Sequence, residues 1–350
     1  MTARPVRAAD LQNAEECARI EAFVAATPGG SPFHRPAWLQ AVAAGCGQRA
    51  HCLIAENADG AIAAMLPLTE VHSPLFGRAL ASSGFAVDGG LLGDEAVFGA
   101  LANEALMLAR RLSCAGVELR GGAAPDGWDR DGETYLGFSR PLAADDEAEL
   151  AAIPRKQRAE VRRALGNDLD VAIGTAEADR AAHYAVYAES VRNLGTPVFP
   201  RSLFDAVLDR FGDDADILTV RKDGHPVASV LSLYHKGAAM PYWGGGTHAA
   251  RGWRANDLMY YALMCHARTA KGCDRFDFGR SKAGTGPAAF KHNWGFEGRP
   301  LSYARMTLDG APPRDVNPLS PRYRLQVALW RKLPLAIANR IGPAIARGLG

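Results

Sequence analysis

The stretches LIAENADGAIAAMLPLTEV (residues 53–71) and ILTVRKDGHPVASVLSLYH (residues 217–235) have one pattern and lie about 160 residues apart. Each places an Asp-Gly pair between two runs rich in apolar residues. Asp59-Gly60 and Asp223-Gly224 are strong β-hairpin signals, because the central positions of tight hairpin turns favour residues that tolerate positive φ. The two stretches therefore predict two hairpins built to one plan.

The elements that follow these hairpins also recur in the same order. Each hairpin precedes a further apolar strand and a Gly-rich loop, SSGFAVDGG (82–90) in the first half and YWGGG (242–246) in the second. A helix comes next, over 96–112 in the first half and from Asn256, the predicted N-cap, in the second. A last strand, VELR or RFDFG, ends each copy. The repetition predicts an α/β (α+β) fold made of two copies of one unit.

An acidic segment with a leading proline, PLAADDEAELAA (141–152), is the expected joint between the copies. We therefore expect a first domain at 1–145, a second at 146–312 and a separate tail at 313–350.

The composition is that of an ordinary folded protein, with 48% apolar and 22% charged residues among 350. None of the six cysteines forms a Cys-x-x-Cys pair and no His-x-x-x-His pair occurs, so we expect reduced thiols and no metal site. The N-terminus has no signal-peptide core, and no apolar run approaches 18 residues. We expect a cytoplasmic location.

The tail has a distinct character. Residues 316–350 hold six cations and no acid, alternating with apolar side chains. This pattern is typical of an amphipathic helix, either packed on the body of the protein or lying on an anionic membrane surface. Packing on the body is the favoured interpretation, and peripheral contact with the inner membrane stays open.

The stretch FDFGRSKAGTGPAAFKHNWGFEGRPL (276–301) resembles a phosphate-binding loop only in part. Gly279 and Gly284 have the Walker spacing, but Thr285 stands where the lysine is required. Gly286 and Pro287 follow in place of an immediate helix start. A nucleotide hydrolase is therefore not indicated.

Several motifs together resemble one known family. IPRKQRAEVRRAL, VRNLGTPVFP, YWGGG, ANDLMYYALM and the 276–301 stretch are similar to the FemAB-related subfamily associated with PEP-CTERM and exosortase systems, and SPFHRPAWLQA (31–41) resembles the entry motif of Fem-type transferases. The resemblance covers most of the chain and is strongest over 153–303. It implies two tandem GNAT-like acyl-CoA N-acyltransferase domains, and transfer of an acyl or aminoacyl group to an amine.

The resemblance also implies site residues. The Phe290-Lys291 pair matches a family motif whose lysine is expected to face the donor carbonyl, where a fixed cation would stabilise the developing oxyanion. Arg280, Ser281 and Lys282 would then contact an anionic substrate or donor. Further substrate-binding positions come only from the resembling motifs, and these are Tyr242, Asn256, Thr196 and Arg201.

Asp277 lies on the predicted strand between Phe276 and Phe278, which point to the other face. A carboxylate there needs a partner. It could accept the proton of the attacking amine. Structural pairing with Arg280 or Lys282 is the favoured alternative.

A basic helix is predicted at the start of the second copy, with five cations over residues 155–163: Arg155, Lys156, Arg158, Arg162 and Arg163. Like charges on one helix face repel, so an anionic partner is one interpretation and a solvated face is the other. The partner would be an anionic envelope or polysaccharide precursor, or tRNA. Few aromatic residues are interleaved, so sequence-specific RNA recognition is not expected. No DNA partner is expected either.

These observations lead to three functional hypotheses. The first is a Fem-like transferase acting on an amine of an envelope or exopolysaccharide precursor, without a permanently bound cofactor and with aminoacyl-tRNA or acyl-CoA as donor. The second is a CoA-dependent N-acyltransferase of an amino sugar, which is weakened because THAARGWRAN (247–256) lacks the usual glycine spacing of a pyrophosphate loop. The third is a non-catalytic GNAT-fold protein that binds a polyanion or a membrane.

Overall fold

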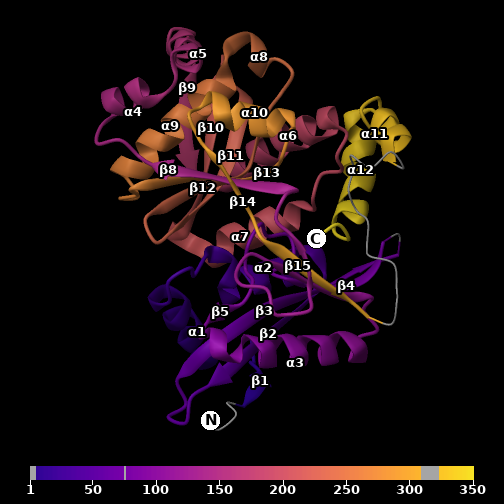
Figure 1. Ribbon diagram of the computed structural model, residues 1–350. Helices are drawn as coiled ribbons and strands as arrows, with labels where there is room; N and C mark the ends of the chain where they lie inside the picture. Colours follow the sequence, from indigo (N-terminus) through magenta and orange to yellow (C-terminus); the bar gives the residue numbers. More distant parts are fainter. Residues whose placement is uncertain (1–4, 75, 309–322) are drawn as a thin grey trace. The chain divides into compact units, whose positions relative to one another are not determined.

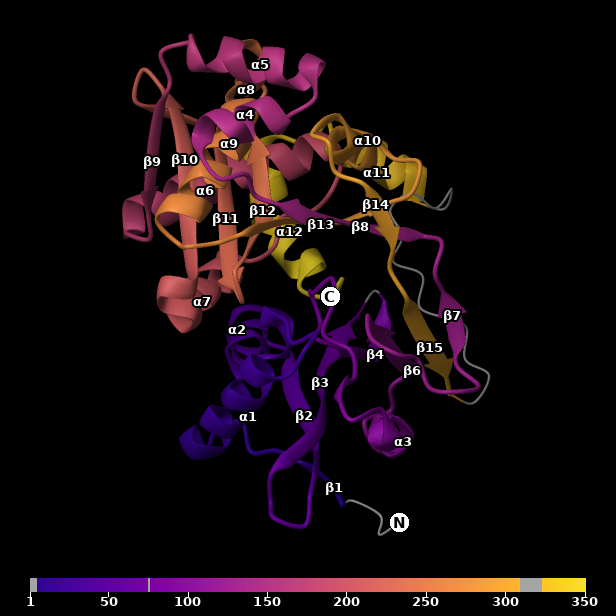
Figure 2. The same ribbon diagram turned by 60° about the vertical axis from the view of Figure 1, so that its left-hand side comes forward.

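The computed structural model describes residues 5–74, 76–308 and 323–350. These residues form two compact units. Unit 1 comprises residues 5–133, 301–308 and 344–350, and unit 2 comprises 134–300 and 323–343. Figures 1 and 2 show the elements of both units.

Unit 1 is built around a mixed sheet with the order β1-β2-β3-β4-β6-β15-β7, with β5 paired to β3. Its strands and α-helices are β1 (Val6–Ala8), α1 (Ala14–Ala26), α2 (Pro36–Cys46), β2 (Arg49–Glu56), β3 (Ile62–Ser73), β4 (Gly77–Ser82), β5 (Leu92–Gly93), α3 (Phe98–Arg111), β6 (Gly116–Arg120), β7 (Asp129–Asp131) and β15 (Tyr303–Thr307).

Unit 2 contains a second sheet, with the order β14-β8-β13-β12-β11-β10-β9. Its elements are β8 (Tyr135–Pro141), α4 (Asp146–Ala152), α5 (Arg155–Leu165), β9 (Asp170–Gly174), α6 (Glu177–Leu194), α7 (Arg201–Phe211), β10 (Ala215–Lys222), β11 (His225–His235), β12 (Ala238–Gly246), α8 (Ala250–Trp253), α9 (Ala255–Thr269), β13 (Arg275–Lys282), α10 (Gly286–Asn293), β14 (Gly298–Pro300) and α11 (Arg324–Trp330). The last helix, α12 (Leu335–Ala346), contributes its residues up to Pro343 to unit 2 and the rest to unit 1.

The predicted repeat is confirmed. Apart from the short strand β5 in unit 1 and the short helix α8 in unit 2, the chain in each unit runs strand, helix, helix, three antiparallel strands, helix, strand, from β1 to β6 and again from β9 to β13. The last strand of each copy then pairs in parallel with the strand before the helix.

The two hairpins turn by different routes. In β10–β11, Asp223 and Gly224 have φ of 50° and 76°, as the sequence predicts for a turn with two left-handed residues. In β2–β3 only Gly60 is left-handed, with φ of 82°. There the Gly60 N–H donates to the Asn57 carbonyl and the Asn57 N–H to the Ala61 carbonyl, which makes a longer turn closed by one glycine.

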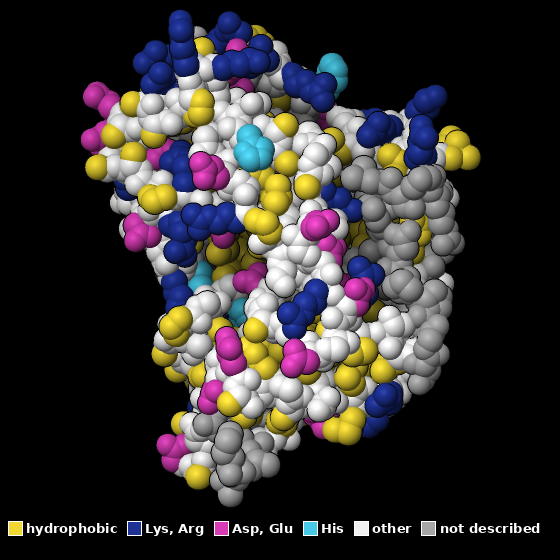
Figure 3. Space-filling view, viewed as in Figure 1, with side chains coloured by type: hydrophobic (Ala, Val, Ile, Leu, Met, Phe, Trp, Pro, Cys, Tyr) yellow, Lys and Arg dark blue, Asp and Glu magenta, His cyan; other side chains and the backbone are white. Residues whose placement is uncertain are grey.

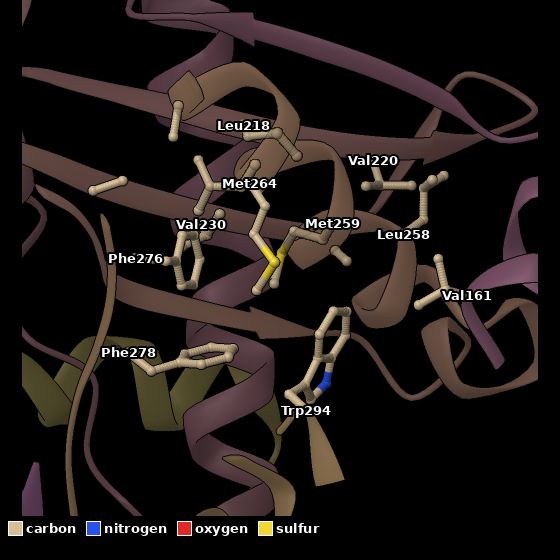
Figure 4. Packing of buried hydrophobic residues seen from close by; sticks show 14 of the residues in the cluster. Val161, Leu218, Val220, Val230, Leu258, Met259, Met264, Phe276, Phe278 and Trp294 are labelled. Carbon is tan, nitrogen blue, oxygen red and sulfur yellow. The ribbon is translucent and has the colours of Figure 1, made fainter. Parts of the chain in front are cut away.

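The core of unit 2 lies between the sheet and α9. Figure 4 shows Met264 of α9 beside Val230 and Phe276 of the strands, and Leu258 of α9 near Val220. The other sheet face is covered by α6, whose buried His183 contacts Ser229 at 3.0 Å. The sheet is therefore buried on both faces.

Two local predictions are wrong. Asn256 does not cap α9, because the helix begins at Ala255 after Arg254 in a left-handed conformation, and the Asn256 Oδ1 atom is buried without a hydrogen-bond partner. YWGGG (242–246) is not a loop either, since it forms the second half of β12.

The units do not follow the predicted continuous domains. The expected first domain, 1–145, includes β8, which pairs with β13 and β14 in unit 2. The expected second domain, 146–312, includes β15, which pairs with β6 and β7 in unit 1. Of the predicted tail, residues 313–322 lie outside the described part and the rest divides between the units. Each sheet is completed by a strand from beyond its own repeat.

Candidate functional site

The parallel strands β12 and β13 stay together over a short distance only. Their register contains two pairs, Ala238 with Arg275 and Ala239 with Phe276. Beyond these pairs, β12 continues to Gly246 and β13 to Lys282 without further pairing between them. In Figure 2, β9 to β12 stand side by side while β8 and β13 run across them. Past Ala239 and Phe276, the facing edges of β12 and β13 therefore have no partner strand among the described residues.

Three glycines on β12 let helices approach the diverging strand closely. A Cβ at Gly245 would lie 2.3 Å from Ser190 Oγ of α6, and one at Gly246 would lie 2.4 Å from Asn256 Oδ1 of α9. At Gly244 the Tyr260 hydroxyl would be 3.4 Å away. Side chains on this strand would push α6 and α9 outward, so the glycines set the width of the site.

Lys291 of α10 packs against β13 just where the strand has left β12. Its Nζ donates to the Arg280 carbonyl at 2.9 Å and lies 5.2 Å and 5.8 Å from the ring centres of Phe138 and Phe278. The residue is 8% exposed. Burial lowers its pKa to about 8, helped by the Arg280 charge and opposed by Asp277. Lys291 is thus a desolvated amine that changes charge near neutral pH.

Asp277 lies beside this lysine on a distorted part of β13. The register with β8 shifts between Asp277 and Arg280, and Gly279 there has φ of 65°. The Asp277 Oδ1 atom accepts the Gly279 N–H at 2.8 Å, so the carboxylate fixes the bulge. The predicted alternation holds, since Phe276 and Phe278 are buried and Asp277 is half-buried.

Arg280, Ser281 and Lys282, predicted to contact an anionic ligand, do not share one face of β13. Arg280 and Lys282 lie over the ring of Tyr135 on β8, at 4.5 and 5.5 Å from its centre. Ser281 points to the opposite, buried face. The two cations are therefore side by side, while Ser281 is removed from them.

The four positions taken from the resembling motifs lie in separate segments of unit 2: Thr196 after α6, Arg201 at the start of α7, Tyr242 in β12 and Asn256 in α9. Arg201 pairs with Glu177 and, at 3.5 Å, with Asp205, so its charge is balanced within unit 2. Tyr242 stands edge-on to Trp243 at 4.8 Å. Thr196 follows the left-handed Gly195 that ends α6. Tyr242 belongs to the glycine-lined strand β12, and the Asn256 Oδ1 atom lies against Gly246 of the same strand.

The predicted basic helix is α5, and it contains all five cations. Its inner face buries Gln157, Val161 and Ala164, and Gln157 donates to Asp257 of α9 at 2.6 Å. Arg155, Lys156, Arg162 and Arg163 are exposed, and Arg163 pairs with Glu160 at 3.5 Å. Half-buried Arg158 donates to the Ala151 carbonyl.

Figure 3 shows Lys and Arg side chains gathered at the top of the view, over α5 and α8. Arg254, beside α8, joins α5 through Glu160 at 2.6 Å. Exposed Trp253 of α8 and Leu165 of α5 lie among these cations, with the Trp253 carbonyl held by Asn167. The basic surface therefore reaches the start of α9, next to β12.

Sequence reasoning missed two residues of this region. Tyr260 of α9 packs between Phe278, at 4.8 Å, and Phe290, at 5.7 Å, and only the fold brings it to Gly244. Phe138 of β8 lies under Lys291 but comes from more than a hundred residues earlier in the chain. Phe138 carries no local motif. Tyr260 lies in the ANDLMYYALM stretch (255–264), but nothing in that stretch distinguishes it from its neighbours.

Two kinds of feature are absent from the described residues. Over residues 5–74, 76–308 and 323–350, no cluster of His, Cys, Asp or Glu could hold a metal ion. Within the same ranges no helix combines the length and apolar character needed to span a bilayer.

Comparison with known proteins agrees with this architecture. The family described as "Acetyltransferase (GNAT) domain" matches residues 154–292. A tandem GNAT protein from the clavulanic acid biosynthesis pathway superposes with a TM-score of 0.56 and 12% identity, covering 88% of this chain and 100% of that one. The chain has a tandem GNAT fold.

Two further solved structures share the tandem GNAT fold. FemX superposes with a TM-score of 0.64 and 15% identity over 82% of this chain and 95% of its own. L-PGS from Bacillus licheniformis superposes with a TM-score of 0.55 and 15% identity, covering 98% of this chain and 99% of that one. A search of curated proteins by sequence finds no match. At these identities the likeness concerns the fold.

Proposed function

We propose that the protein is an N-acyltransferase whose donor binds in unit 2, between the diverging ends of β12 and β13. The observation that supports this most directly is the placement of a buried lysine, Lys291, against β13 where that strand has left β12. The match of the GNAT domain family to residues 154–292 covers both strands and the lysine.

The proposed reaction joins the donor acyl group to an amine. The amine attacks the acyl carbonyl of a thioester or ester, the C–N bond forms, the C–S or C–O bond breaks, and the amine proton leaves with the departing group or through solvent. Negative charge grows on the carbonyl oxygen in the transition state. A protonated Lys291 in a dry site would stabilise that charge, and Asp277 beside it would favour the charged form of the lysine.

The comparison of the two units supports donor binding in unit 2. In unit 1 the equivalent strands β4 and β6 also share two pairs, Leu80 with Val117 and Ala81 with Glu118. There the loop after β4 packs onto the end of β6, so that a Cβ at Gly90 would lie 2.2 Å from the Gly121 carbonyl. This position of unit 1 is occupied by the chain itself.

The basic surface over α5 and α8 supports an anionic donor or acceptor. Its cations lie beside the start of α9, where phosphates of a CoA or of a charged tRNA would reach if the acyl end lies along β12. For the acceptor we propose an amine on an anionic envelope or exopolysaccharide precursor, in keeping with the resemblance to the PEP-CTERM-associated subfamily.

A transfer assay on purified protein tests the proposal. Acetyl-CoA and a set of charged tRNAs serve as donors, and amino sugars and amine-bearing precursors as acceptors, with product detected by mass spectrometry. The Lys291→Met variant should lose about 10²–10³-fold in kcat. Lys332→Met, at an exposed lysine of the same unit, is the control and should remain active.

The non-catalytic alternative makes the opposite forecast. It requires that Lys291→Met leaves the function unchanged while removal of residues 323–350 abolishes it. Equal activity of Lys291→Met and wild type would therefore reject the proposed mechanism.

A further inference from the structure

Unit 1 holds a segment from far along the sequence, made of the end of α12 and the turn that follows it, in which the Gly348 N–H donates to the Ile345 carbonyl and the Leu349 N–H to the Ala346 carbonyl. Residues 344–350 belong to this unit, and Gly348 and Gly350 are buried in it. The segment passes the start of β2, the end of β3 and the loop after β4. It therefore crosses one side of the unit at the ends of three neighbouring strands.

Two buried polar side chains hold the segment by its backbone. Gln48, 7% exposed, donates its Nε2 to the Arg347 carbonyl at 2.5 Å. The same amide is fixed by the backbone of His72, since its Oε1 accepts the His72 N–H at 2.9 Å and its Nε2 also donates to the His72 carbonyl at 3.2 Å. Gln48 thus links the backbone of β3 to the turn after α12 through its side-chain amide.

The second is Arg120 at the end of β6, which is 6% exposed. Its Nη2 donates to the Gly350 carbonyl at 3.2 Å, its Nη1 to the Ala86 carbonyl at 3.0 Å and its Nε to Glu118 at 2.9 Å. A buried guanidinium needs an acceptor on each side, so loss of the segment would leave one donor direction unfilled.

The fit also selects glycine. A Cβ at Gly348 would lie 2.5 Å from Ser73 Cβ, and one at Gly350 would lie 2.4 Å from Phe85 Cε2. Neither glycine has positive φ, so close contact and not backbone conformation excludes a side chain here. Unit 1 thus binds the segment through two backbone carbonyls and leaves no room for a side chain at two positions. Such contacts select a peptide with glycine at those positions.

We infer that unit 1 contains a peptide-binding groove, lined by Gln48, Ser73, Phe85 and Arg120, whose resident ligand is the segment Arg347–Gly350. A peptide with glycine at the same two places can replace the segment from solution. The groove is separate from the divergent strands of unit 2 and does not depend on the proposed transfer reaction.

The test uses a fluorescently labelled peptide AIARGLG, the sequence of residues 344–350, and follows its anisotropy. A protein lacking Arg347–Gly350 should bind the peptide saturably, and full-length protein should bind at least about tenfold more weakly, because the tethered segment competes at high effective concentration. Arg120→Gln in the shortened protein should weaken binding roughly tenfold or more. Arg110→Gln, an exposed arginine on α3, is the matched control.

A peptide with alanine at both glycine positions should not bind. Equal binding of the two peptides, equal binding to full-length and shortened protein, or no binding to a shortened protein that is folded by circular dichroism would each overturn the inference.

A second measurement serves if the shortened protein does not fold. In the full chain, the seated segment should protect the Arg347–Gly348 bond from trypsin, whereas the Gly348→Ala, Gly350→Ala double variant should be cleaved there at least about tenfold faster. Equal cleavage rates in the two proteins would contradict the inference.

Discussion

Lys291 combines a charge with a buried position, and these two properties oppose each other. Burial between Phe138 and Phe278 disfavours the ammonium form, while the Arg280 carbonyl and Asp277 favour it. A lysine used only for packing would be better replaced by an apolar residue. A desolvated cation that costs stability is consistent with the catalytic role proposed for Lys291.

This opposition predicts a pH-dependent difference in stability between wild type and Lys291→Met. Below pH 8 the lysine is charged in both folded and unfolded states, and burying the charge costs on the order of 3 kcal/mol, because the folded pKa is about 8 against 10.5. Between pH 8 and 10.5 the unfolded state binds more protons, so the stability of the wild type rises with pH. The methionine variant should therefore be more stable at pH 7, by less than this amount since the Arg280 carbonyl loses its donor, and its advantage should vanish by about pH 10.5.

Urea unfolding of both proteins at pH 7 and pH 10 measures the effect. Lys332→Met, at an exposed lysine, should show no such pH dependence. A constant difference between wild type and Lys291→Met across this range would mean that the lysine is not desolvated in the folded state.

Catalysis should show the same titration if the lysine acts as a cation. We expect kcat to fall as pH rises through about 8, because the folded-state lysine then loses its proton. A pH–rate profile of the transfer reaction tests this. An activity that stays constant from pH 7 to 9.5 would rule out a required ammonium group.

At the scale of elements, strand β12 determines the shape of the proposed donor site. Its first half pairs with β13, and its second half, from Tyr242 to Gly246, has three glycines against α6 and α9. The sequence marks these glycines, but as a loop. Local propensity favours a loop for three glycines, and only the pairing of Ala228, Ser229 and Val230 with Gly246, Gly245 and Gly244 makes them a strand.

A substitution at Gly245 tests whether the glycines set the spacing of α6 and β12. Gly245→Ala should destabilise unit 2 by about 1–3 kcal/mol, because its Cβ would meet Ser190 Oγ at 2.3 Å. Ser190→Gly should restore much of the loss in the double variant. Gly252→Ala, on α8 with nothing within 4 Å, is the matched control. Chemical denaturation of the four proteins measures the coupling, and additive losses in the double variant would contradict the contact.

Local signals predicted the elements better than the side-chain partners. The Asp-Gly turns, the helices and the repeat follow from residues near one another in sequence. The role expected for Arg201 did not account for Glu177 and Asp205, which come together with it only when α6 and α7 pack. The Asn256 cap was wrong because the chain enters α9 from α8 through a left-handed Arg254.

At the scale of the whole molecule, the chain crosses from one sheet to the other twice after its first repeat. β8 leaves the first repeat to lie between β13 and β14, and β15 returns to lie between β6 and β7. A strand's sheet depends on which edge is open after folding, and sequence order does not state it. Domain boundaries placed at the acidic joint therefore miss both strands, although the repeat itself is correctly recognised.

The placement of β8 predicts how fragments of unit 2 behave. A fragment of residues 134–300 contains every strand of its sheet, whereas 146–300 lacks β8, which pairs with six residues of β13 and three of β14. β8 also supplies Phe138, 1% exposed, to the core. Without it, two strands lose their common neighbour and the rings beside Lys291 lose their packing, so we expect cooperative unfolding for 134–300 and none for 146–300.

Near-ultraviolet circular dichroism during urea unfolding distinguishes the two fragments. A peptide of residues 134–145 should restore the transition to the shorter fragment in a concentration-dependent manner; a cooperative transition in 146–300 alone would show that β8 is dispensable to this sheet.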